Sequence, residues 1–340
     1  MLNGSGNVFL ISLIWVQMIM KLLSLLADGE FHSGDDLGVA LGVTRAAVWK
    51  QVQRLQEDKG LDIFSVKGKG YRLSSPMDLL DSSKIKDGLS ESVKRLIGEV
   101  QIFGSITSTN DIAMKHAEAR GDPGYVCVAE QQTAGRGRRG RPWVSPYGTN
   151  IYLSLVWDFF NGAAALEGLS LAVGVAVANA LKAQGVDGVE LKWPNDVLVD
   201  GAKLGGILLE MTGDPSGHCH VVLGIGINIS VSKKDGAVID QPWVDAMALG
   251  VSIDRNEFIS DIIGELVSML VLFSEHGFAY FRDQWLALDA FKGKAVVVKM
   301  GKNDVAGVAS GVDKTGALRL DREGTIETIK GGEVSLRLDK

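Results

Sequence analysis

The spacing of apolar residues changes twice along this chain of 340 residues, and no other feature limits its fold as much. Up to about residue 57, apolar residues recur mainly at helical spacing. Between about 85 and 288, strand-like apolar runs are mixed with long amphipathic helices. After Phe291 only short strand-like runs remain, separated by Gly, Asp and Asn turns. These three patterns predict an α+β protein of several domains.

We place the domain boundaries at the two changes of pattern. Pro76 and the Ser/Asp-rich residues that follow it mark a connector between the first two parts. The expected parts are an N-terminal extension at 1–19, a winged helix-turn-helix DNA-binding domain at 20–78, a mixed α/β domain at 85–288 and a small SH3-like β-barrel at 291–340.

The same patterns predict individual elements. The expected central strands are Tyr125–Ala129, Asn150–Trp157, Val189–Trp193, Val197–Asp200, Gly206–Met211 and His220–Ile229. The expected central helices are Asp111–Ala119, Leu166–Ala183, Glu257–Glu275 and Phe278–Leu288. The expected C-terminal strands are Ala295–Met300, Val305–Val312, Ala317–Leu320, Thr325–Ile329 and Val334–Leu338.

A helix with a basic face is expected near the N-terminus. Thr44 is a good N-cap for a helix that runs to about Glu57, and Val48, Val52 and Leu55 share one face of it. A shorter helix precedes it across a glycine-containing turn, which is the pattern of a helix-turn-helix. The outer face of the second helix is expected to carry Arg45, Lys50, Gln51 and Arg54.

A basic hairpin follows this helix pair. Residues 61–66 and 71–73 read as two strands joined by Lys67-Gly-Lys-Gly70, which is typical of the wing of a winged helix. The local charge is positive although the whole chain has a formal net charge of −6, so DNA binding would be local. The alternative is a small helical protein-interaction domain with solvated lysines. The predicted DNA-binding residues are Thr44, Arg45, Lys50, Gln51, Arg54, Lys67 and Lys69.

The first twenty residues are unusually apolar, with no Lys or Arg before Lys21. They fit neither a membrane-spanning helix nor a secretory signal, because the apolar run is short and lacks a basic start. We expect no membrane association and a cytoplasmic protein. Our hypothesis is that Met18 or Met20 is the natural start, so that the extension is not native.

The cysteines and histidines predict no metal site. Cys127 and Cys219 lie in apolar runs, which suits two buried thiols in a reducing compartment. In His218-Cys219-His220, strand alternation would point Cys219 away from both histidines, and no further ligands with metal-site spacing follow.

Chemistry is concentrated in a loop that combines arginine with glycine. Gly135–Arg141 reads Gly-Arg-Gly-Arg-Arg-Gly-Arg. Glycines let a backbone close around a ligand, and guanidinium groups offer forked donors to phosphate or carboxylate oxygens. Such a loop predicts an anionic ligand.

Four further clusters stand beside apolar strands, where pockets form. They are Ser108-Thr109-Asn110, Gln131-Gln132, Lys192-Trp-Pro-Asn-Asp196 with Lys203, and Gly224-Ile-Gly-Ile-Asn228. Each alone has an ordinary structural explanation, such as a helix N-cap or a close-packed strand. Their joint presence is what indicates a site.

Taken together, these motifs resemble those of the biotin–protein ligases. Glu130-Gln-Gln-Thr-Ala-Gly-Arg-Gly-Arg-Arg-Gly-Arg141, then Trp143, then Lys192–Asp196 and Lys203-Leu-Gly-Gly-Ile207 have the order and spacing seen in that family. With the winged domain, the chain resembles the bifunctional class that is also the biotin operon repressor. The resemblance implies a central ligase domain of the class II synthetase-like type.

The resemblance also implies roles for individual residues. The implied biotin-binding residues are Ser108, Thr109, Asn110, Gln132, Arg136, Gly137, Arg138 and Lys203. The implied nucleotide-binding residues are Arg138, Arg139, Arg141, Trp143, Asn195 and Asn228. The implied catalytic residues are Lys203, Arg138, Arg136 and Asp196. Residues 231–242 match the family least, so we transfer no contacts to them.

The implied reaction is carboxylate activation followed by acyl transfer. The biotin carboxylate attacks the α-phosphate of ATP and displaces pyrophosphate, which leaves biotinyl-5'-adenylate. A lysine amine of the biotin carboxyl carrier protein of acetyl-CoA carboxylase then attacks this mixed anhydride and displaces AMP. Cationic side chains and Mg²⁺ would offset the repulsion between the two anions. The implied partners are this carrier, operator DNA of biotin-synthesis genes, and a second copy of the chain when the adenylate is bound.

Two alternatives remain open from the sequence. A lipoate–protein ligase shares the chemistry but binds an acyl chain without a ureido ring, and Gln132 favours biotin. A ligand-sensing transcription regulator without ligase activity is the other alternative, and Lys203 with the intact arginines argues against it.

Overall fold

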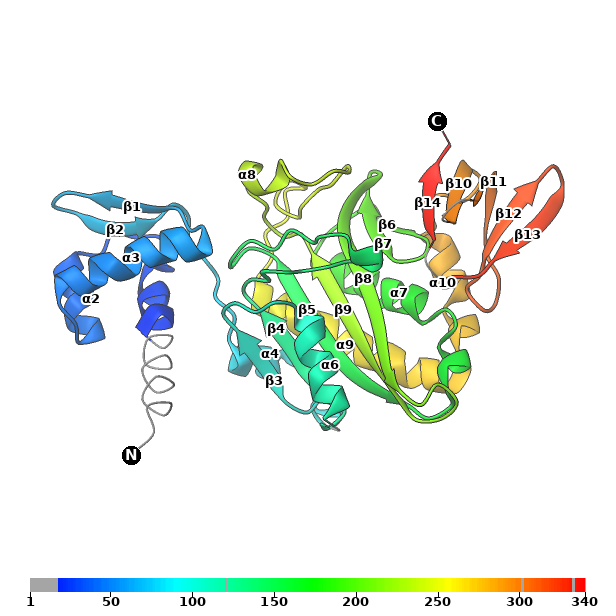
Figure 1. Ribbon diagram of the computed structural model, residues 1–340, viewed down its shortest axis with the longest axis horizontal. Coiled ribbons are helices and arrows are strands. Elements are labelled where there is room, and N and C mark those ends of the chain that lie inside the picture. Colours follow the sequence, from blue (N-terminus) through cyan, green and yellow to red (C-terminus); the bar gives the residue numbers. More distant parts are fainter. Residues whose placement is uncertain (1–17, 120, 301–302, 332–333, 340) are drawn as a thin grey trace, which may run out of the picture. The chain divides into compact units, whose positions relative to one another are not determined.

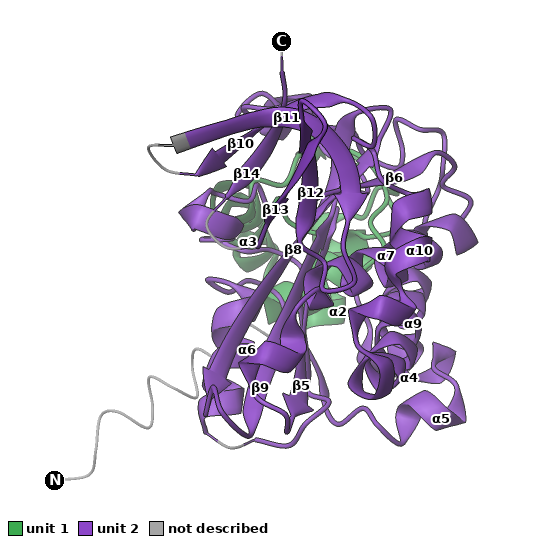
Figure 2. Ribbon diagram, turned by 90° about the vertical axis from the view of Figure 1, so that its right-hand side faces the viewer, with its two compact units in different colours: residues 1–79, 146–148 green, residues 80–145, 149–340 purple. Residues whose placement is uncertain are grey.

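The computed structural model describes residues 18–119, 121–300, 303–331 and 334–339. The chain divides into two compact units, one of residues 1–79 with 146–148 and one of residues 80–145 with 149–340 (Figure 2). Residues 1–17, which make up most of the expected N-terminal extension, lie outside the described residues.

Capping residues fix the helices of the first unit. The Ser33 hydroxyl accepts a hydrogen bond from the Asp36 amide, and Thr44 accepts one from Ala47. Gly42 and Gly60 end the two helices in the left-handed conformation, with φ of 69° and 67°. The elements are a helix at 18–26, α2 (Gly34–Leu41), α3 (Arg45–Lys59), β1 (Ile63–Val66) and β2 (Gly70–Leu73).

The wing is an antiparallel hairpin, as predicted. β1 pairs with β2 from Ile63 opposite Leu73 to Val66 opposite Gly70. Tyr71 also bridges to His32, which ties the hairpin to the segment before α2. One apolar core holds the unit together, and it includes Leu22, Leu26, Leu37, Val48, Val52, Leu55, Ile63 and Leu73.

The second unit is built on a seven-stranded sheet in the order β3-β4-β5-β9-β8-β7-β6. Only the β3–β4 pair is parallel, and the other pairs are antiparallel. The strands are β3 (Val100–Phe103), β4 (Val126–Ala129), β5 (Ile151–Phe159), β6 (Val189–Lys192), β7 (Asp196–Val199), β8 (Ala202–Gly213) and β9 (Cys219–Ile227). The sequence pattern missed β3 and the first residues of β8.

Helices cover both faces of this sheet (Figure 1). On one face α7 and α9 pack over the large core, and on the other α6 packs over a smaller cluster that includes Ala113, Cys127 and Val222. The helical elements are α4 (Ser82–Gly88), α5 (Glu91–Lys94), α6 (Thr109–Glu118), η1 (Arg138–Gly140), η2 (Ala163–Leu166), α7 (Leu169–Ala183), α8 (Lys233–Gly236), α9 (Arg255–His276), η3 (Phe278–Tyr280) and α10 (Arg282–Ala287).

Residues 163–183 are apolar and long enough, by composition, to cross a membrane, but 61% of their most apolar window is buried. Leu171, Val175 and Leu181 of this segment lie in the core beneath the sheet. Their burial explains the hydropathy of α7.

The C-terminal strands form a second antiparallel sheet in the order β13-β12-β11-β10-β14. The register between β11 and β12 shifts between Ala309 and Val312, as at a β-bulge. The strands are β10 (Ala295–Met300), β11 (Asn303–Val312), β12 (Leu318–Arg322), β13 (Thr325–Ile329) and β14 (Ser335–Leu338). These are the five short strands that the sequence predicts.

Candidate active site and DNA-facing surface

Every residue predicted to bind biotin lines one pocket of the second unit. The pocket has about 950 Å³ of space, part of it open to solvent. It lies over the sheet at Gly224–Gly226 of β9 and Gly206–Leu208 of β8. The structure thus brings together segments that are more than a hundred residues apart in the sequence.

Polar side chains at the start of α6 form one end of the pocket. Ser154 Oγ donates to Asn110 Oδ1 at 2.6 Å, and Asn110 Nδ2 donates to Glu210 Oε2 at 2.7 Å. Gln132 Oε1 accepts from the Thr109 amide at 2.8 Å. Asn110 is buried, so its amide is fixed in one orientation by these partners. A ring with its own donors and acceptors would find matched polar atoms here.

Gly224 is required beside this network. A Cβ at Gly224 would stand 2.1 Å from Asn110 Oδ1, closer than any real contact. The glycine therefore makes room for the Asn110 amide directly above β9.

One carboxylate and two lysines form the centre of the site. Lys203 Nζ lies 2.6 Å from Asp196 Oδ1, and Lys192 Nζ is paired with the other carboxylate oxygen. Burial opposes ionisation of Asp196, but the two ammonium groups outweigh it and hold the pKa of this carboxyl below its usual value. Burial also lowers the pKa of Lys192, against the attraction of Asp196. The cluster places positive charge in the pocket.

The arginine-glycine loop closes over the pocket with two of its arginines held by acceptors. Arg136 is paired with Asp111 and with both oxygens of Glu210, at 3.0 Å. Burial opposes its charge, but these carboxylates prevail and raise the pKa of Arg136. Arg138 donates to Asn195 Oδ1 at 3.1 Å and to the backbone carbonyl of Val334 at 3.4 Å.

A second pocket adjoins the first and shares Arg141, Trp143 and Lys203 with it. Of the predicted nucleotide-binding residues, Asn228 lines only this second pocket, and its amide donates to Val244 O at 3.2 Å. A Cβ at Gly226 would meet the Trp143 ring at 2.6 Å. Among the described residues, the buried indole nitrogen of Trp143 has no hydrogen-bond partner.

The prediction from the sequence did not include several residues of this site. Asp111 directly follows the Ser108–Asn110 cluster and could have been included with it. Glu210 stands two residues after Leu208 on β8 and so points to the same side of the sheet, but nothing in the sequence pairs it with Arg136. The residues of β14 and its approach that line the pocket carry no sequence signal, and they are Val334, Ser335 and Leu336.

In the first unit, most of the predicted DNA-binding residues are exposed. They are Thr44, Arg45, Lys50, Arg54, Lys67 and Lys69. Thr44 has a structural role as well, because it caps α3. Trp49 is 51% exposed on the same helix and was not predicted.

Gln51 was wrongly assigned to the DNA-facing set. Its side chain is fully buried. Gln51 stands three residues after Val48 and four before Leu55, so helical periodicity puts it on the apolar stripe. Its amide has no hydrogen-bond partner among the described residues.

Comparisons with known proteins agree with this geometry. The Biotin/lipoate A/B protein ligase family model matches residues 102–228. An HTH domain model matches 19–72, and the Biotin protein ligase C terminal domain model matches 292–337. The fold and the pocket therefore define a biotin–protein ligase that carries a DNA-binding domain.

Individual relatives show which kind of biotin–protein ligase this chain resembles. "Bifunctional ligase/repressor BirA" of Escherichia coli (strain K12) is 42% identical over 319 residues, covering 94% of this chain and 97% of the relative. The chain belongs to this family of bifunctional ligase/repressors. "Biotin--[acetyl-CoA-carboxylase] ligase" of Paracoccus denitrificans is 36% identical over 67% of this chain and 96% of its own length. The solved biotin protein ligase from Aquifex aeolicus in complex with biotin and ATP matches with a TM-score of 0.61 and 27% identity, over 72% of this chain and 100% of that chain.

Proposed function

We propose that the chain activates biotin with ATP to biotinyl-5'-adenylate and transfers the biotinyl group to a lysine of the biotin carboxyl carrier protein of acetyl-CoA carboxylase. The observation that carries this proposal is that a polar end at Asn110 and Gln132, a cationic centre at Lys203 and the arginine-glycine loop share one pocket. Those three parts match a ureido ring, a carboxylate meeting a phosphate, and a phosphoanhydride.

In this proposal each part has its own task. Asn110 and Gln132 orient the ring, with Ser108 and Thr109 beside them. Lys203, with Arg136 and Arg138, neutralises the carboxylate as it approaches the α-phosphate. Asp196 holds Lys203 in place. The loop backbone at Gly137 lies over the junction and excludes water.

The nucleotide would occupy the adjoining second pocket. Trp143 offers a ring face there, and Arg141 and Asn228 line the same pocket. Arg139 and Asn195 line the adjoining first pocket, from which they would reach the phosphate end of the nucleotide. Mg²⁺ would supply further charge neutralisation. Both oxygens of Asp196 are paired with lysines, so the ion would be held chiefly by phosphate oxygens and water, as Mg²⁺ at nucleotides commonly is.

The decisive experiment is transfer of labelled biotin to a carrier domain in the presence of ATP and Mg²⁺. We expect labelling of the carrier by the wild-type chain, loss of labelling when Mg²⁺ is chelated, and no competition from excess lipoate. Absence of labelling would refute the ligase and leave the regulator without ligase activity. Efficient competition by lipoate would favour the lipoate–protein ligase.

We further propose that the first unit represses a biotin-synthesis operon as part of an adenylate-bound homodimer. Paired winged helices read paired half-sites, so a dimer on a two-half-site operator is expected. An electrophoretic shift on such an operator, with and without biotinyl-adenylate, tests the repressor. Sedimentation under the same conditions tests the dimer, and a monomer with adenylate bound would refute it.

We propose that the protein is cytoplasmic, because the carrier protein, the operator DNA and a thiol-reducing environment are all found there. The free, buried Cys127 and Cys219 support this placement. We also propose that the DNA-binding domain spans residues 20–78, the biotin- and ATP-binding domain 85–288 and the SH3-like domain 291–340.

A further inference from the structure

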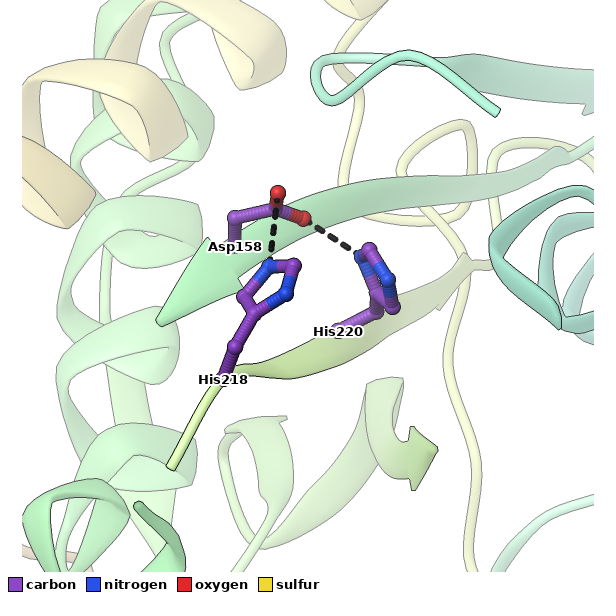
Figure 3. A group of neighbouring side chains, drawn as sticks. All are labelled: Asp158, His218 and His220. Atoms are coloured by element: carbon purple, nitrogen blue, oxygen red, sulfur yellow. Dashed lines mark hydrogen bonds and ion pairs between the residues drawn. The ribbon is translucent and has the colours of Figure 1, made fainter. Parts of the chain in front are cut away.

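Two histidines and one aspartate gather at the end of β5 and β9, outside the pockets described above (Figure 3). Asp158 Oδ1 lies 2.6 Å from His220 Nδ1, and Asp158 Oδ2 lies 3.0 Å from His218 Nε2. One ligand atom from each residue lies within 4.8 Å of the others. Figure 3 shows both imidazole rings turned toward the one carboxylate.

The sheet register creates this cluster. Asp158 is directly opposite His220 in the β5–β9 pair. His218 stands two residues before His220 and so points to the same side of the sheet. Cys219 points to the opposite side and is fully buried, as the sequence predicts. The sequence spacing failed to indicate a site because the third ligand comes from a strand sixty residues earlier.

The surrounding loops hold the two histidines in place. The turn between β8 and β9 is closed by a hydrogen bond from the Asp214 amide to His218 O, at 2.9 Å. The Gly162 amide donates to Gly217 O at 3.0 Å, which ties this turn to the segment after β5. The Phe160 ring stacks on the His218 ring at 4.7 Å. The ligand atoms are therefore close together without any ion, so binding requires little ordering.

We propose that Asp158, His218 and His220 bind one divalent transition-metal ion of the zinc type. Two imidazoles and a carboxylate suit Zn²⁺, Co²⁺ or Ni²⁺ better than Mg²⁺ or Ca²⁺, which prefer oxygen ligands alone. A tetrahedral site with bonds of about 2.1 Å separates its ligand atoms by about 3.4 Å. The spacings here reach that geometry with small side-chain rotations. Three protein ligands leave one position for water.

This site is separate from the proposed ligase chemistry. His220 and Gly226 are on the same strand, and six residues of strand span about 20 Å. Gly226 lines the biotin pocket, whereas none of the three ligands lines it. An ion here would connect the ends of β5 and β9 and the β8–β9 turn, so its effect on the protein is stabilisation.

The competing explanation is a hydrogen-bonded His–Asp–His group that takes no metal. In that case the histidines only hydrogen-bond to a carboxylate whose side chain is 16% exposed. The two explanations differ in a measurable way, because only the first predicts saturable binding of one ion.

The test uses the full-length chain without a polyhistidine tag, stripped with chelator, and without ATP or biotin. Titration with Zn²⁺ by calorimetry should give one site. Titration with Co²⁺ should give the intense visible absorption of a four-coordinate ion. Thermal unfolding should shift to higher temperature with Zn²⁺ and not with Mg²⁺.

Three variants and one control test which side chains bind the metal ion. Asp158→Asn keeps the shape of the side chain, and His218→Ala and His220→Ala each remove one imidazole. Each should weaken Zn²⁺ binding by about 10-fold or more. His276→Ala, an exposed histidine whose Nε2 lies 3.6 Å from Glu275, should bind Zn²⁺ like the wild type. Failure of the wild type to bind one ion, or equal binding by all variants, would overturn the proposal. If a variant does not fold, the wild-type Co²⁺ spectrum still decides whether the ion is four-coordinate.

Discussion

Lys203 Nζ lies 2.6 Å from Asp196 Oδ1, and Lys192 is paired with the other oxygen of the same carboxylate. One anion thus fixes two cations at the centre of the pocket. Lys203 also lies 5.3 Å from the centre of the Trp143 ring, so its ammonium group stands between the two adjoining pockets. This position is where a carboxylate from one side would meet a phosphate from the other.

Replacing Lys203 should block the first half-reaction. In Lys203→Met the side chain keeps its bulk, and Asp196 keeps Lys192 as a partner. We expect biotinyl-adenylate formation to slow by about 100- to 1000-fold, the usual effect of removing one group that stabilises developing charge. Single-turnover formation of the adenylate measures this. Lys299→Met, which removes an exposed ion pair with Asp304, is the control, and an unchanged rate in Lys203→Met would exclude the role.

The charge cluster also predicts an acid-dependent part of the folding free energy. The folded-state pKa of Asp196 is lower than its unfolded value of about 3.9. Its contribution is therefore fully present above about pH 3.9 and is lost as the pH falls through the folded-state pKa. Urea unfolding between about pH 6 and pH 3 should show this loss, and Lys192→Met should reduce it by raising the pKa of Asp196. Identical profiles for the two proteins would contradict this account.

Substitutions at two glycines of β9 should each impair the kinetics of a different substrate. In Gly224→Ala the new methyl group displaces Asn110, whereas in Gly226→Ala it displaces the Trp143 ring. We expect the first variant to lose kcat/KM for biotin and the second to lose it for ATP, each by about 10- to 100-fold. Steady-state kinetics with each substrate varied measures this. The two variants are controls for each other, and equal losses for both substrates would mean that the strand has moved as a whole.

Arg138 should slow the dissociation of biotinyl-adenylate from the pocket. Its guanidinium reaches Asn195 and the Val334 carbonyl, and so closes the loop across the pocket mouth. We expect Arg138→Ala to release biotinyl-adenylate about 10-fold or more faster, because charge-assisted hydrogen bonds are lost. Filter binding or stopped-flow dissociation measures the release. Arg322→Ala removes an exposed arginine of β12 and should leave it unchanged.

The wing lysines should contribute to DNA affinity in a salt-dependent way. Lys67→Ala and Lys69→Ala should each reduce the slope of log affinity against log salt by about 0.9 if each lysine contacts one phosphate. Ligase activity should not change. Gln51→Met is the matched control, since Gln51 is buried, and its slope should equal that of the wild type. Replacing its unpaired amide should also leave folding stability unchanged or raise it.

Much of the fold was predictable because local signals agreed with tertiary packing. Thr44 and Gly60 fix the ends of α3 by capping, and the strand-like runs after Phe291 became β10 to β14. β3 was missed because only Val100 of its four residues is buried and the other three are partly buried, so the strand shows no clear alternation. The helix after Thr44 was predicted, but Gln51 was placed on the wrong face of it. Its polar side chain was taken as a sign of exposure, although helical periodicity puts it beside Val48 and Leu55.

The site was predictable only where its residues lie in compact motifs. Arg136, Arg138 and Lys203 stand in such motifs, and all three line the pocket. Glu210 and Asp158 do not. Glu210 meets Arg136 of the loop and Asn110 of α6 only through tertiary packing, and Asp158 meets His220 through strand register. Register is a property of paired strands, so a single strand's sequence cannot show which side chains will meet across the sheet.

The bond from Arg138 to Val334 ends on a backbone oxygen. No side-chain replacement at Val334 removes that acceptor, so alanine scanning of the C-terminal sheet would pass over it. The contact depends on where β14 runs, and a graft that pairs this ligase core with the C-terminal sheet of a relative could lose it while keeping every side chain of both parts. In such a hybrid, the hydrogen bond forms only if the last strand keeps its position relative to the loop. A high sequence identity alone would not ensure that position.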